Sequence, residues 1–218
     1  GMRILSKNDQ EAMKLREFYK DNGLFVVNLM SSPGSGKTTL LENIAKNHLL
    51  DFSVVEGDLQ TNRDAQRLAR HGVNAYQITT GDACHLEALM VKEALDNLQQ
   101  QGDLRDFLFI ENVGNLVCPA SYDLGANMNI VLLSTAEGDD KVLKYPTMFM
   151  CADAVIISKS DLIEVFEFEV GQVKEDLAKL KKEIPLFLVA KNDLESIKKV
   201  CDFLKVNKEK NYVSSHTF

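Results

Sequence analysis

Residues 31–39 (SSPGSGKTT) combine glycines, hydroxyl side chains and one lysine in the order of a phosphate-binding loop. Gly34 and Gly36 let backbone N–H groups curl around an anion, and the helix expected to follow adds its positive end. Ser31 stands where such loops usually begin with glycine. An ordinary Gly/Ser turn is the alternative. The apolar stretch before the run and the helical pattern after it favour a nucleoside triphosphate site instead. The expected contacts are Pro33, Gly34, Ser35, Gly36, Lys37, Thr38 and Thr39, with Lys37 on the outer phosphates and the Thr38 hydroxyl on Mg²⁺.

Two carboxylates follow apolar, strand-like stretches and can complete this site. Asp58 comes after residues 52–56 and is expected to meet Mg²⁺ beside Thr38. Glu111 ends the stretch 107–111, where a carboxylate can hold Mg²⁺ through water or orient the attacking water. Helix capping for Asp58 and a strand-end charge for Glu111 are the alternatives. We expect Lys37, Asp58 and Glu111 to support catalysis and the Gly114 backbone N–H to meet the γ-phosphate.

Two further strand ends carry residues that can recognise a purine base. The run Ser158-Lys159-Ser160-Asp161 resembles the N-K-x-D guanine motif with serine in place of asparagine. The Asp161 carboxylate can accept hydrogen bonds from guanine N1 and N2, a donor pattern that adenine lacks. The Lys159 stem can lie along the purine. After the last strand, Ala190 and Lys191 resemble the S-A-K element whose backbone N–H meets guanine O6. GTP is therefore favoured over ATP.

Cys84, His85 and Cys118 form a possible soft metal site, suited to Zn²⁺ or Ni²⁺ and poor for Mg²⁺. Three ligands do not complete a tetrahedron, so a second copy of the chain is one source of the fourth. The adjacent Cys84 and His85 side chains are expected to diverge. From spacing alone, two buried thiols and a surface histidine are the favoured alternative. Cys151 and Cys201 lie on apolar helical faces and are expected in the core.

The elements that must position these residues alternate between strands and helices. Continuous apolar strands predict a mainly parallel sheet covered by helices, the three-layer α/β architecture of P-loop NTPases. We expect an N-terminal helix within residues 1–23, one domain at 24–206 and a solvated tail at 207–218. The predicted strands are 24–30, 52–56, 75–78, 107–111, 130–134, 154–158 and 186–190, and the predicted helices are 8–22, 39–47, 62–70, 86–100, 170–182 and 194–206.

The composition limits the possible partners. The chain of 218 residues has a net charge of −7, which argues against a nucleic-acid surface. No apolar run can span a bilayer and no leader is evident, so we expect a cytoplasmic protein that binds no membrane. Four cysteines are too few for a disulfide framework.

The chain resembles HypB, the family of GTPases that incorporate nickel into hydrogenase. The similarity spans roughly residues 24–190, and the segments ACHL and ENVGNLVCPA are specific to this family among P-loop GTPases. The blocks that carry the resemblance are SSPGSGKTTLL, EGDLQTNR, QITTGDACHL, IENVGNLVCPA and EGDDKVLKYP.

The resemblance implies a GTPase of the SIMIBI-like group, which forms homodimers when nucleotide binds. It implies delivery of nickel to the large subunit of NiFe-hydrogenase together with the accessory protein HypA, and in some bacteria also service to urease. It also implies GTP or GDP as ligand, Mg²⁺ at Thr38 and Asp58, and Ni²⁺ or Zn²⁺ at Cys84, His85 and Cys118. Lys141 and Lys144 become candidates to meet the partner subunit's nucleotide.

Two further expectations follow. Glu111 and Cys118 share one strand-end loop, so GTP hydrolysis is expected to change metal affinity. Turnover is expected to be slow, because no arginine is clearly aimed at the phosphates; Arg63 and Arg67 are the candidates. The rival readings are a urease accessory-type or cobalamin-type GTPase chaperone, a small-molecule kinase, and a metallochaperone in which nucleotide serves only assembly.

Overall fold

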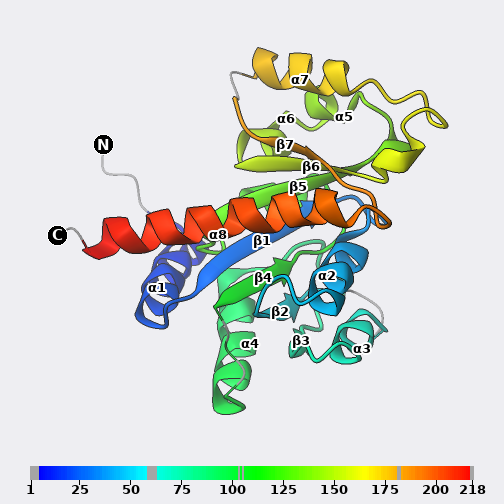
Figure 1. Ribbon diagram of the computed structural model, residues 1–218. Coiled ribbons are helices and arrows are strands. Elements are labelled where there is room, and N and C mark those ends of the chain that lie inside the picture. The colour runs from blue at the N-terminus through cyan, green and yellow to red at the C-terminus, as the bar shows by residue number, and fades with distance from the viewer. Residues whose placement is uncertain (1–4, 58–62, 103, 105, 181–182, 217–218) are drawn as a thin grey trace.

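The centre of the computed structural model is a seven-stranded parallel sheet with the order β3-β2-β4-β1-β5-β6-β7 (Figure 1). The structure describes the chain except residues 1–4, 58–62, 103, 105, 181–182 and 217–218, and it describes no side chains for residues 213–216. All seven predicted strands are present. They are β1 (Phe25–Ser31), β2 (Phe52–Glu56), β3 (Ala75–Gln77), β4 (Phe107–Glu111), β5 (Met128–Ser134), β6 (Ala154–Ser158) and β7 (Leu186–Leu188).

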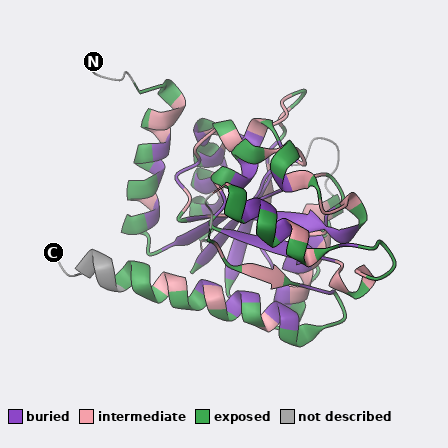
Figure 2. Ribbon diagram, turned by 90° about the horizontal axis from the view of Figure 1, so that it is seen from above, coloured by how far each residue is buried: buried purple, intermediate pink, exposed green. Residues whose placement is uncertain are grey.

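Helices cover both faces of the sheet and so complete the predicted three layers. Apolar residues of α2, α3 and α8 pack on one face. On the other face α1 and α4 cover one half, and α5, α6 and α7 cover the half formed by β5 and β6. Figure 2 shows the buried strands enclosed between these helices. The bounds are α1 (Lys7–Asp21), α2 (Lys37–Lys46), α3 (Arg63–Ala69), α4 (Ala88–Gln100), α5 (Lys141–Lys144), α6 (Pro146–Met150), α7 (Val170–Lys179) and α8 (Leu194–His216).

The last helix is longer than the sequence patterns predicted. The helix expected to end at Val206 continues to His216, through the residues that were expected to form a tail. The segment is rich in lysine and contains no glycine or proline, and lysine and glutamate are good helix formers. The short α5 and α6 were not predicted, because four or five residues show no periodicity.

The parallel sheet brings the chemically interesting strand ends to one edge. Strand β4 lies between β2 and β1, and the register pairs Glu56 of β2 directly with Glu111 of β4. On the other side of β1, Ser134 of β5 pairs with Ser158 of β6. In the described part of the chain, no helix is apolar and long enough to cross a membrane.

Candidate functional site

The phosphate-binding loop connects β1 to α2 in the predicted strand–loop–helix arrangement. Gly34 and Gly36 have φ angles of 73° and 97°, a left-handed conformation that glycine adopts without strain. Gly36 is the N-cap of α2, so the first amides of that helix face the loop. The Lys37 ammonium donates a 2.9 Å hydrogen bond to Ser31 Oγ. Serine at the first loop position thus holds the lysine across the loop.

A cavity of about 510 Å³ opens above this loop. The predicted Gly114 and Glu111 lie in its wall, and the Thr38 hydroxyl donates a 2.6 Å hydrogen bond to Glu111 Oε1. The predicted phosphate contacts therefore surround one space. Its full lining is Pro33, Gly34, Ser35, Gly36, Lys37, Thr38, Thr39, Glu56, Asp64, Arg67, Glu111, Asn112, Val113 and Gly114.

Three carboxylates, Glu56, Asp64 and Glu111, lie together in this cavity, with one oxygen of each within 4.8 Å of the others. Glu56 and Glu111 are buried, and each has one side-chain oxygen without a hydrogen-bond partner. Burial, followed by the negative charge of Glu111, raises the pKa of Glu56 to about 11. Such a cluster supplies the oxygen ligands that a hard divalent cation prefers, and the cation would neutralise the negative charge of these carboxylates.

Glu56 and Asp64 were missed at the sequence level. Glu56 is a carboxylate at the end of a buried strand, which is the signal that identified Glu111. The same signal could therefore have identified Glu56 from the sequence. Asp58, which was expected to hold Mg²⁺, lies outside the described residues. Its role stays a prediction.

Arg67, one of the two candidate arginines, lines the cavity but is held by neighbouring acids. Its Nε lies 3.0 Å from Glu42 Oε2 and its Nη1 lies 3.7 Å from Asp64 Oδ1. Its Nη2 is 3.4 Å from Thr39 Oγ1. Arg63, the other candidate, is exposed and is not part of the lining.

A second cavity of about 320 Å³ adjoins the first, and Ser35, Gly36 and Thr39 line both. The predicted Lys159, Asp161 and Lys191 lie in its wall. Ala190 is buried beside it, and its amide N–H donates to Ser196 Oγ at 3.3 Å. Apolar residues complete the wall, as a flat base requires. They include Leu40, Leu132, Ile156, Leu162, Phe166, Val189 and Ile197.

Hydrogen bonds from the end of β6 tie this second cavity to the phosphate-binding loop. The Ser158 hydroxyl donates a 2.6 Å hydrogen bond to the carbonyl oxygen of Ser35, and Lys159 Nζ lies 3.3 Å from the carbonyl oxygen of Gly34. Lys159 itself has a φ of 55°, and its carbonyl accepts a hydrogen bond from Thr135 Oγ1. Serine in place of the usual asparagine thus still makes a contact with the loop.

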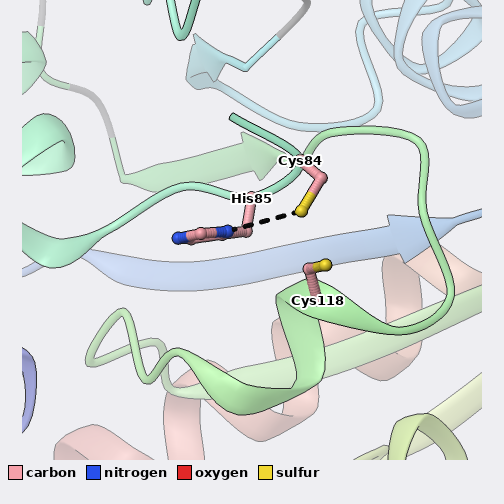
Figure 3. A group of neighbouring side chains, drawn as sticks. All are labelled: Cys84, His85 and Cys118. Carbon is pink, nitrogen blue, oxygen red and sulfur yellow. Dashed lines mark hydrogen bonds between the residues drawn. The ribbon is translucent and has the colours of Figure 1, made fainter. Parts of the chain in front are cut away.

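Cys84, His85 and Cys118 converge in space (Figure 3). Their ligand atoms lie within 4.8 Å of one another, all three residues are half-buried, and Cys84 Sγ is 3.7 Å from His85 Nδ1. The expectation that the Cys84 and His85 side chains diverge is therefore wrong. The backbone bends at these two residues in the connection before α4, and the bend lets the adjacent side chains turn to one side.

The two thiols of this cluster differ in acidity. Hydrogen bonds from Cys118 and then from His85 lower the pKa of the Cys84 thiol. The interaction with Cys84, followed by desolvation, raises the pKa of Cys118. Cys84 is thus the more acidic of the two thiols.

Backbone contacts join Cys84, His85 and Cys118, here called the thiol cluster, to the larger cavity above the phosphate-binding loop, here called the phosphate cavity. A Cβ added to Gly114 would lie 3.0 Å from Pro33 Cα, and the Asn115 N–H donates to the Ser31 carbonyl at 2.8 Å. Asn115 Oδ1 in turn accepts from the Cys118 N–H at 3.1 Å. The loop from β4 to Cys118 is therefore packed on the phosphate-binding loop.

A second contact joins the two sites from the other side. A Cβ added to Gly57, next to Glu56, would lie 2.9 Å from the side chain of the buried Leu86. Leu86 directly follows His85. Both sides of the thiol cluster thus touch the chain that surrounds the phosphate cavity.

The remaining candidates lie apart from these cavities. Cys201 is buried in the core as predicted, and burial raises its pKa to about 12, whereas Cys151 is only half-buried. Lys141 and Lys144 belong to α5, and Lys144 makes an exposed 2.8 Å ion pair with Asp140. Neither lysine lines the two nucleotide-sized cavities of its own chain.

Comparison with known proteins gives consistent matches over nearly the whole chain. The sequence pattern of the family described as CobW/HypB/UreG, nucleotide-binding domain, matches residues 25–188. The hydrogenase/urease maturation factor HypB of Helicobacter hepaticus is 63% identical over 218 residues, covering 99% of this chain and 90% of that protein.

Solved structures agree with these sequence matches and confirm the predicted P-loop fold. The crystal structure of HypB from Helicobacter pylori in complex with nickel matches with a TM-score of 0.93 and 63% identity, covering 98% of this chain and all of that one. The crystal structure of hydrogenase maturation factor HypB from Archaeoglobus fulgidus matches with a TM-score of 0.83 and 35% identity, covering 94% of this chain and 100% of that one.

Proposed function

Since the chain belongs to the HypB family of CobW/HypB/UreG nucleotide-binding domains, we propose that it is a GTPase that assists nickel insertion into NiFe-hydrogenase. One loop carries this proposal. Glu111 and Gly114 line the larger cavity, and Cys118, on the same loop, belongs to the thiol cluster. One short stretch of chain therefore faces both the nucleotide and the metal.

GTP fits the two joined cavities. The triphosphate occupies the larger cavity above Lys37 and the N-terminus of α2, and the guanine occupies the smaller one. The Asp161 carboxylate accepts hydrogen bonds from the guanine N1 and N2 donors. ATP offers no matching donor pair and would leave this carboxylate without a partner, so it binds more weakly.

The acidic end of the larger cavity fits Mg²⁺. The Thr38 hydroxyl and the unpartnered oxygens of Glu56 and Glu111 are hard ligands. Asp58 lies outside the described residues, and its part in holding Mg²⁺ stays a prediction from the sequence. When bound, Mg²⁺ neutralises charge on the phosphates during transfer. Lys37 moves from Ser31 Oγ to the outer phosphates, and the Gly114 N–H donates to the γ-phosphate.

Cys84, His85 and Cys118 form the cargo site for Ni²⁺ or Zn²⁺. Two thiol groups and an imidazole are the donors that these ions prefer over Mg²⁺. A site that is half-buried can exchange its ion with a partner protein, which a delivery factor must do. The proposed partners are a second copy of this chain, a HypA-type accessory protein and the hydrogenase large subunit.

The nucleotide state changes metal affinity through the contacts between Gly114 and Pro33 and between Gly57 and Leu86. Loss of the γ-phosphate releases the loop after β4, and that movement reaches Cys118. Coupling of this kind is reciprocal, so a nucleotide that weakens nickel binding is itself weakened by nickel to the same degree.

The test is calorimetric titration of Ni²⁺ into the protein loaded with Mg²⁺-GDP and with a non-hydrolysable Mg²⁺-GTP analogue. We expect the nickel affinities of the two nucleotide states to differ by about fivefold or more. In a variant that carries both Cys84→Ala and Cys118→Ala, the heat of nickel binding should disappear in both states. Equal nickel affinities in the two states would contradict the coupling. Failure to bind GTP at all would contradict the whole proposal.

A separate experiment tests which enzyme receives the nickel. The relatives carry names that include both hydrogenase and urease, so co-purification with the hydrogenase large subunit is compared with co-purification with the urease apoprotein. Retention of the hydrogenase subunit supports the proposed client. Retention of urease alone would assign the chain to urease maturation.

A further inference from the structure

The His85 ring is held on three sides by described residues. Tyr122 stacks on its face, with ring centroids 3.7 Å apart and planes 8° from parallel. Its Nε2 lies 3.3 Å from Glu87 Oε1, while its Nδ1 points to Cys84 Sγ. Only 16% of the His85 side chain is exposed. The ring therefore has one orientation before any metal arrives.

This orientation decides which ring nitrogen can bind a metal ion. A carboxylate at Nε2 accepts the N–H of the neutral imidazole and leaves the lone pair on Nδ1. A tetrahedral ion with ordinary Zn–S and Zn–N bond lengths holds its sulfur and nitrogen ligands about 3.6 Å apart. The observed 3.7 Å between Cys84 Sγ and His85 Nδ1 matches that separation. The pair is thus already at the spacing that such an ion requires.

Glu87 can serve the histidine because another residue caps its helix. Glu87 occupies the N-cap position of α4 but makes no capping hydrogen bond with its own side chain. Instead Asn8 Oδ1, from α1, accepts a 2.8 Å hydrogen bond from the Ala88 N–H. The Glu87 carboxylate is therefore available to turn back to His85.

The same asparagine also fixes the residue after the stacking tyrosine. Asn8 Nδ2 donates a 2.9 Å hydrogen bond to the carbonyl oxygen of Asp123. Arg16 of α1 holds the Asp123 carboxylate at 2.6 Å. Helix α1 therefore anchors both chain segments that hold the imidazole.

We propose that Glu87 and Tyr122 are positioning residues that hold His85 with Nδ1 toward the metal, and that Asn8 fixes both of them. The inference rests on the proposed Cys84, His85 and Cys118 metal site. It gives the N-terminal helix a role in metal binding, although that helix supplies no ligand. Residues that orient a ligating histidine typically change metal affinity by about 10- to 100-fold.

The first experiment titrates Co²⁺, a tetrahedral stand-in for Zn²⁺, into the full nucleotide-free chain and follows the thiolate-to-metal absorption. Glu87→Gln should weaken Co²⁺ binding by about tenfold or more. Glu93→Gln removes the same charge from an exposed position of the same helix and should leave the affinity unchanged. Equal affinities of Glu87→Gln and wild type would overturn the role of Glu87.

A double-mutant cycle separates positioning from general damage to the fold. In a His85→Ala background there is no ring to orient, so Glu87→Gln should cause no further loss of Co²⁺ affinity. A further tenfold loss in that background would show that Glu87 acts through something other than His85 and would overturn the proposal.

Tyr122 and Asn8 are tested with conservative partners. Tyr122→Phe keeps the stacked ring and should keep wild-type affinity, whereas Tyr122→Leu should weaken Co²⁺ binding by several-fold. Asn8→Ala should also weaken it, and Gln10→Ala, on the same helix, should not. Equal affinities of the Tyr122→Phe and Tyr122→Leu variants, or of Asn8→Ala and wild type, would overturn the corresponding role.

The thiol variants distinguish failure of this inference from failure of the metal site itself. Cys84→Ala and Cys118→Ala should each weaken the thiolate absorption band, and the double variant should abolish it. If they do so while Glu87→Gln binds like wild type, only the positioning role is wrong. If Co²⁺ binds normally without the two thiols, the metal site is wrong and the positioning role fails with it.

Discussion

The phosphate cavity and the thiol cluster lie close together but treat a metal ion in opposite ways. In the cavity, Glu56 and Glu111 are 2% and 4% exposed, and their two carboxyl groups are held together out of water, so Glu56 keeps its proton when no cation is bound. In the thiol cluster, the sulfur atoms and the imidazole are half-buried and near enough to solvent for exchange. The first arrangement suits an ion that stays with its nucleotide, and the second suits an ion that must leave.

The difference also extends to how each site is prepared for its ion. The carboxylates cannot both be ionised without a cation, so the raised pKa of Glu56 reflects a site that is unfavourable when empty. The histidine beside Cys84 is instead held in place by the Tyr122 ring and by the carboxylate of Glu87, which remains partly exposed to water, so these contacts cost little without metal. Variants in each site should therefore separate nucleotide binding from metal binding.

The largest expected effect comes from Lys37→Ala. This change removes the cation that meets the outer phosphates and should lower the GTP hydrolysis rate by about 100- to 1,000-fold. Co²⁺ or Ni²⁺ binding by the nucleotide-free protein should not change, because Lys37 is not part of the thiol cluster. Phosphate release and metal titration measure the two effects.

Lys46→Ala, at the exposed end of the same helix, is the matched control and should hydrolyse GTP at the wild-type rate. If Lys37→Ala also weakened metal binding without nucleotide, the two sites would be less separate than the geometry indicates. Normal metal delivery by the hydrolysis-deficient variant would favour the reading in which nucleotide serves only assembly.

Glu56→Gln should make the protein more stable and less active. The folded protein keeps a proton on Glu56 that the unfolded chain releases above its ordinary pKa of 4.5, so this group lowers stability as the pH rises from 4.5 toward about 11. Glutamine cannot ionise, so the variant should gain about 1–3 kcal/mol in metal-free buffer at pH 8 and little near pH 4. Thermal unfolding with a chelator across this pH range measures the gain.

The same substitution removes a hard ligand from the cavity, and Mg²⁺-dependent hydrolysis should fall by about 100-fold. The effects on stability and on hydrolysis therefore have opposite signs. A stability gain that did not depend on pH would contradict the shared burial of the two carboxylates.

The parts that could be read from sequence are those in which local residue types decide the structure. Short runs of β-branched or other apolar residues predicted all seven strands, and a parallel sheet then required their ends to meet at one edge. The phosphate-binding loop followed from its glycines and lysine. The α8 helix was predicted too short because charged residues were interpreted as a tail, although they favour helix.

The parts that could not be read depend on contacts between distant segments. The His85 ring beside Cys84 stacks on Tyr122 and lies against Glu87, and the first amide of α4 donates to Asn8, 80 residues away in sequence. No periodicity encodes such contacts. Glu56 differs from these cases, since its position at a buried strand end was visible and only its pairing with Glu111 was not.

The packing contact between Gly114 and Pro33, which links the two sites, is tested by Gly114→Ala. The added Cβ would lie 3.0 Å from the backbone of Pro33, so the phosphate-binding loop must shift, at a cost of about 1–3 kcal/mol. GTP affinity should fall by about tenfold, and the difference in nickel affinity between the GDP and GTP states should shrink. Calorimetry with each nucleotide measures both changes.

Gly171→Ala, in α7, is the matched control. A Cβ at Gly171 meets nothing within 4 Å, so this variant should bind GTP normally and be slightly more stable. If Gly114→Ala weakened GTP but left the nickel difference intact, the coupling would have to run through Gly57 and Leu86 instead.

The smallest expected effect is at Ser158. This residue lies where the smaller cavity, the proposed site of the guanine base and here called the base cavity, meets the phosphate-binding loop. Ser158→Ala removes the 2.6 Å hydrogen bond to the Ser35 carbonyl, which is worth about 0.5–1.5 kcal/mol. GTP and GDP affinities should both fall by about two- to tenfold, while the hydrolysis rate at saturating GTP should not change.

Ser160→Ala, on the same turn but outside both cavities, should bind nucleotide normally. Ser158→Asn restores a donor at this position and should bind GTP at least as well as wild type. A fall in the saturated hydrolysis rate of Ser158→Ala would place Ser158 among the residues that act on the phosphates, and the division between base cavity and phosphate cavity would have to be redrawn.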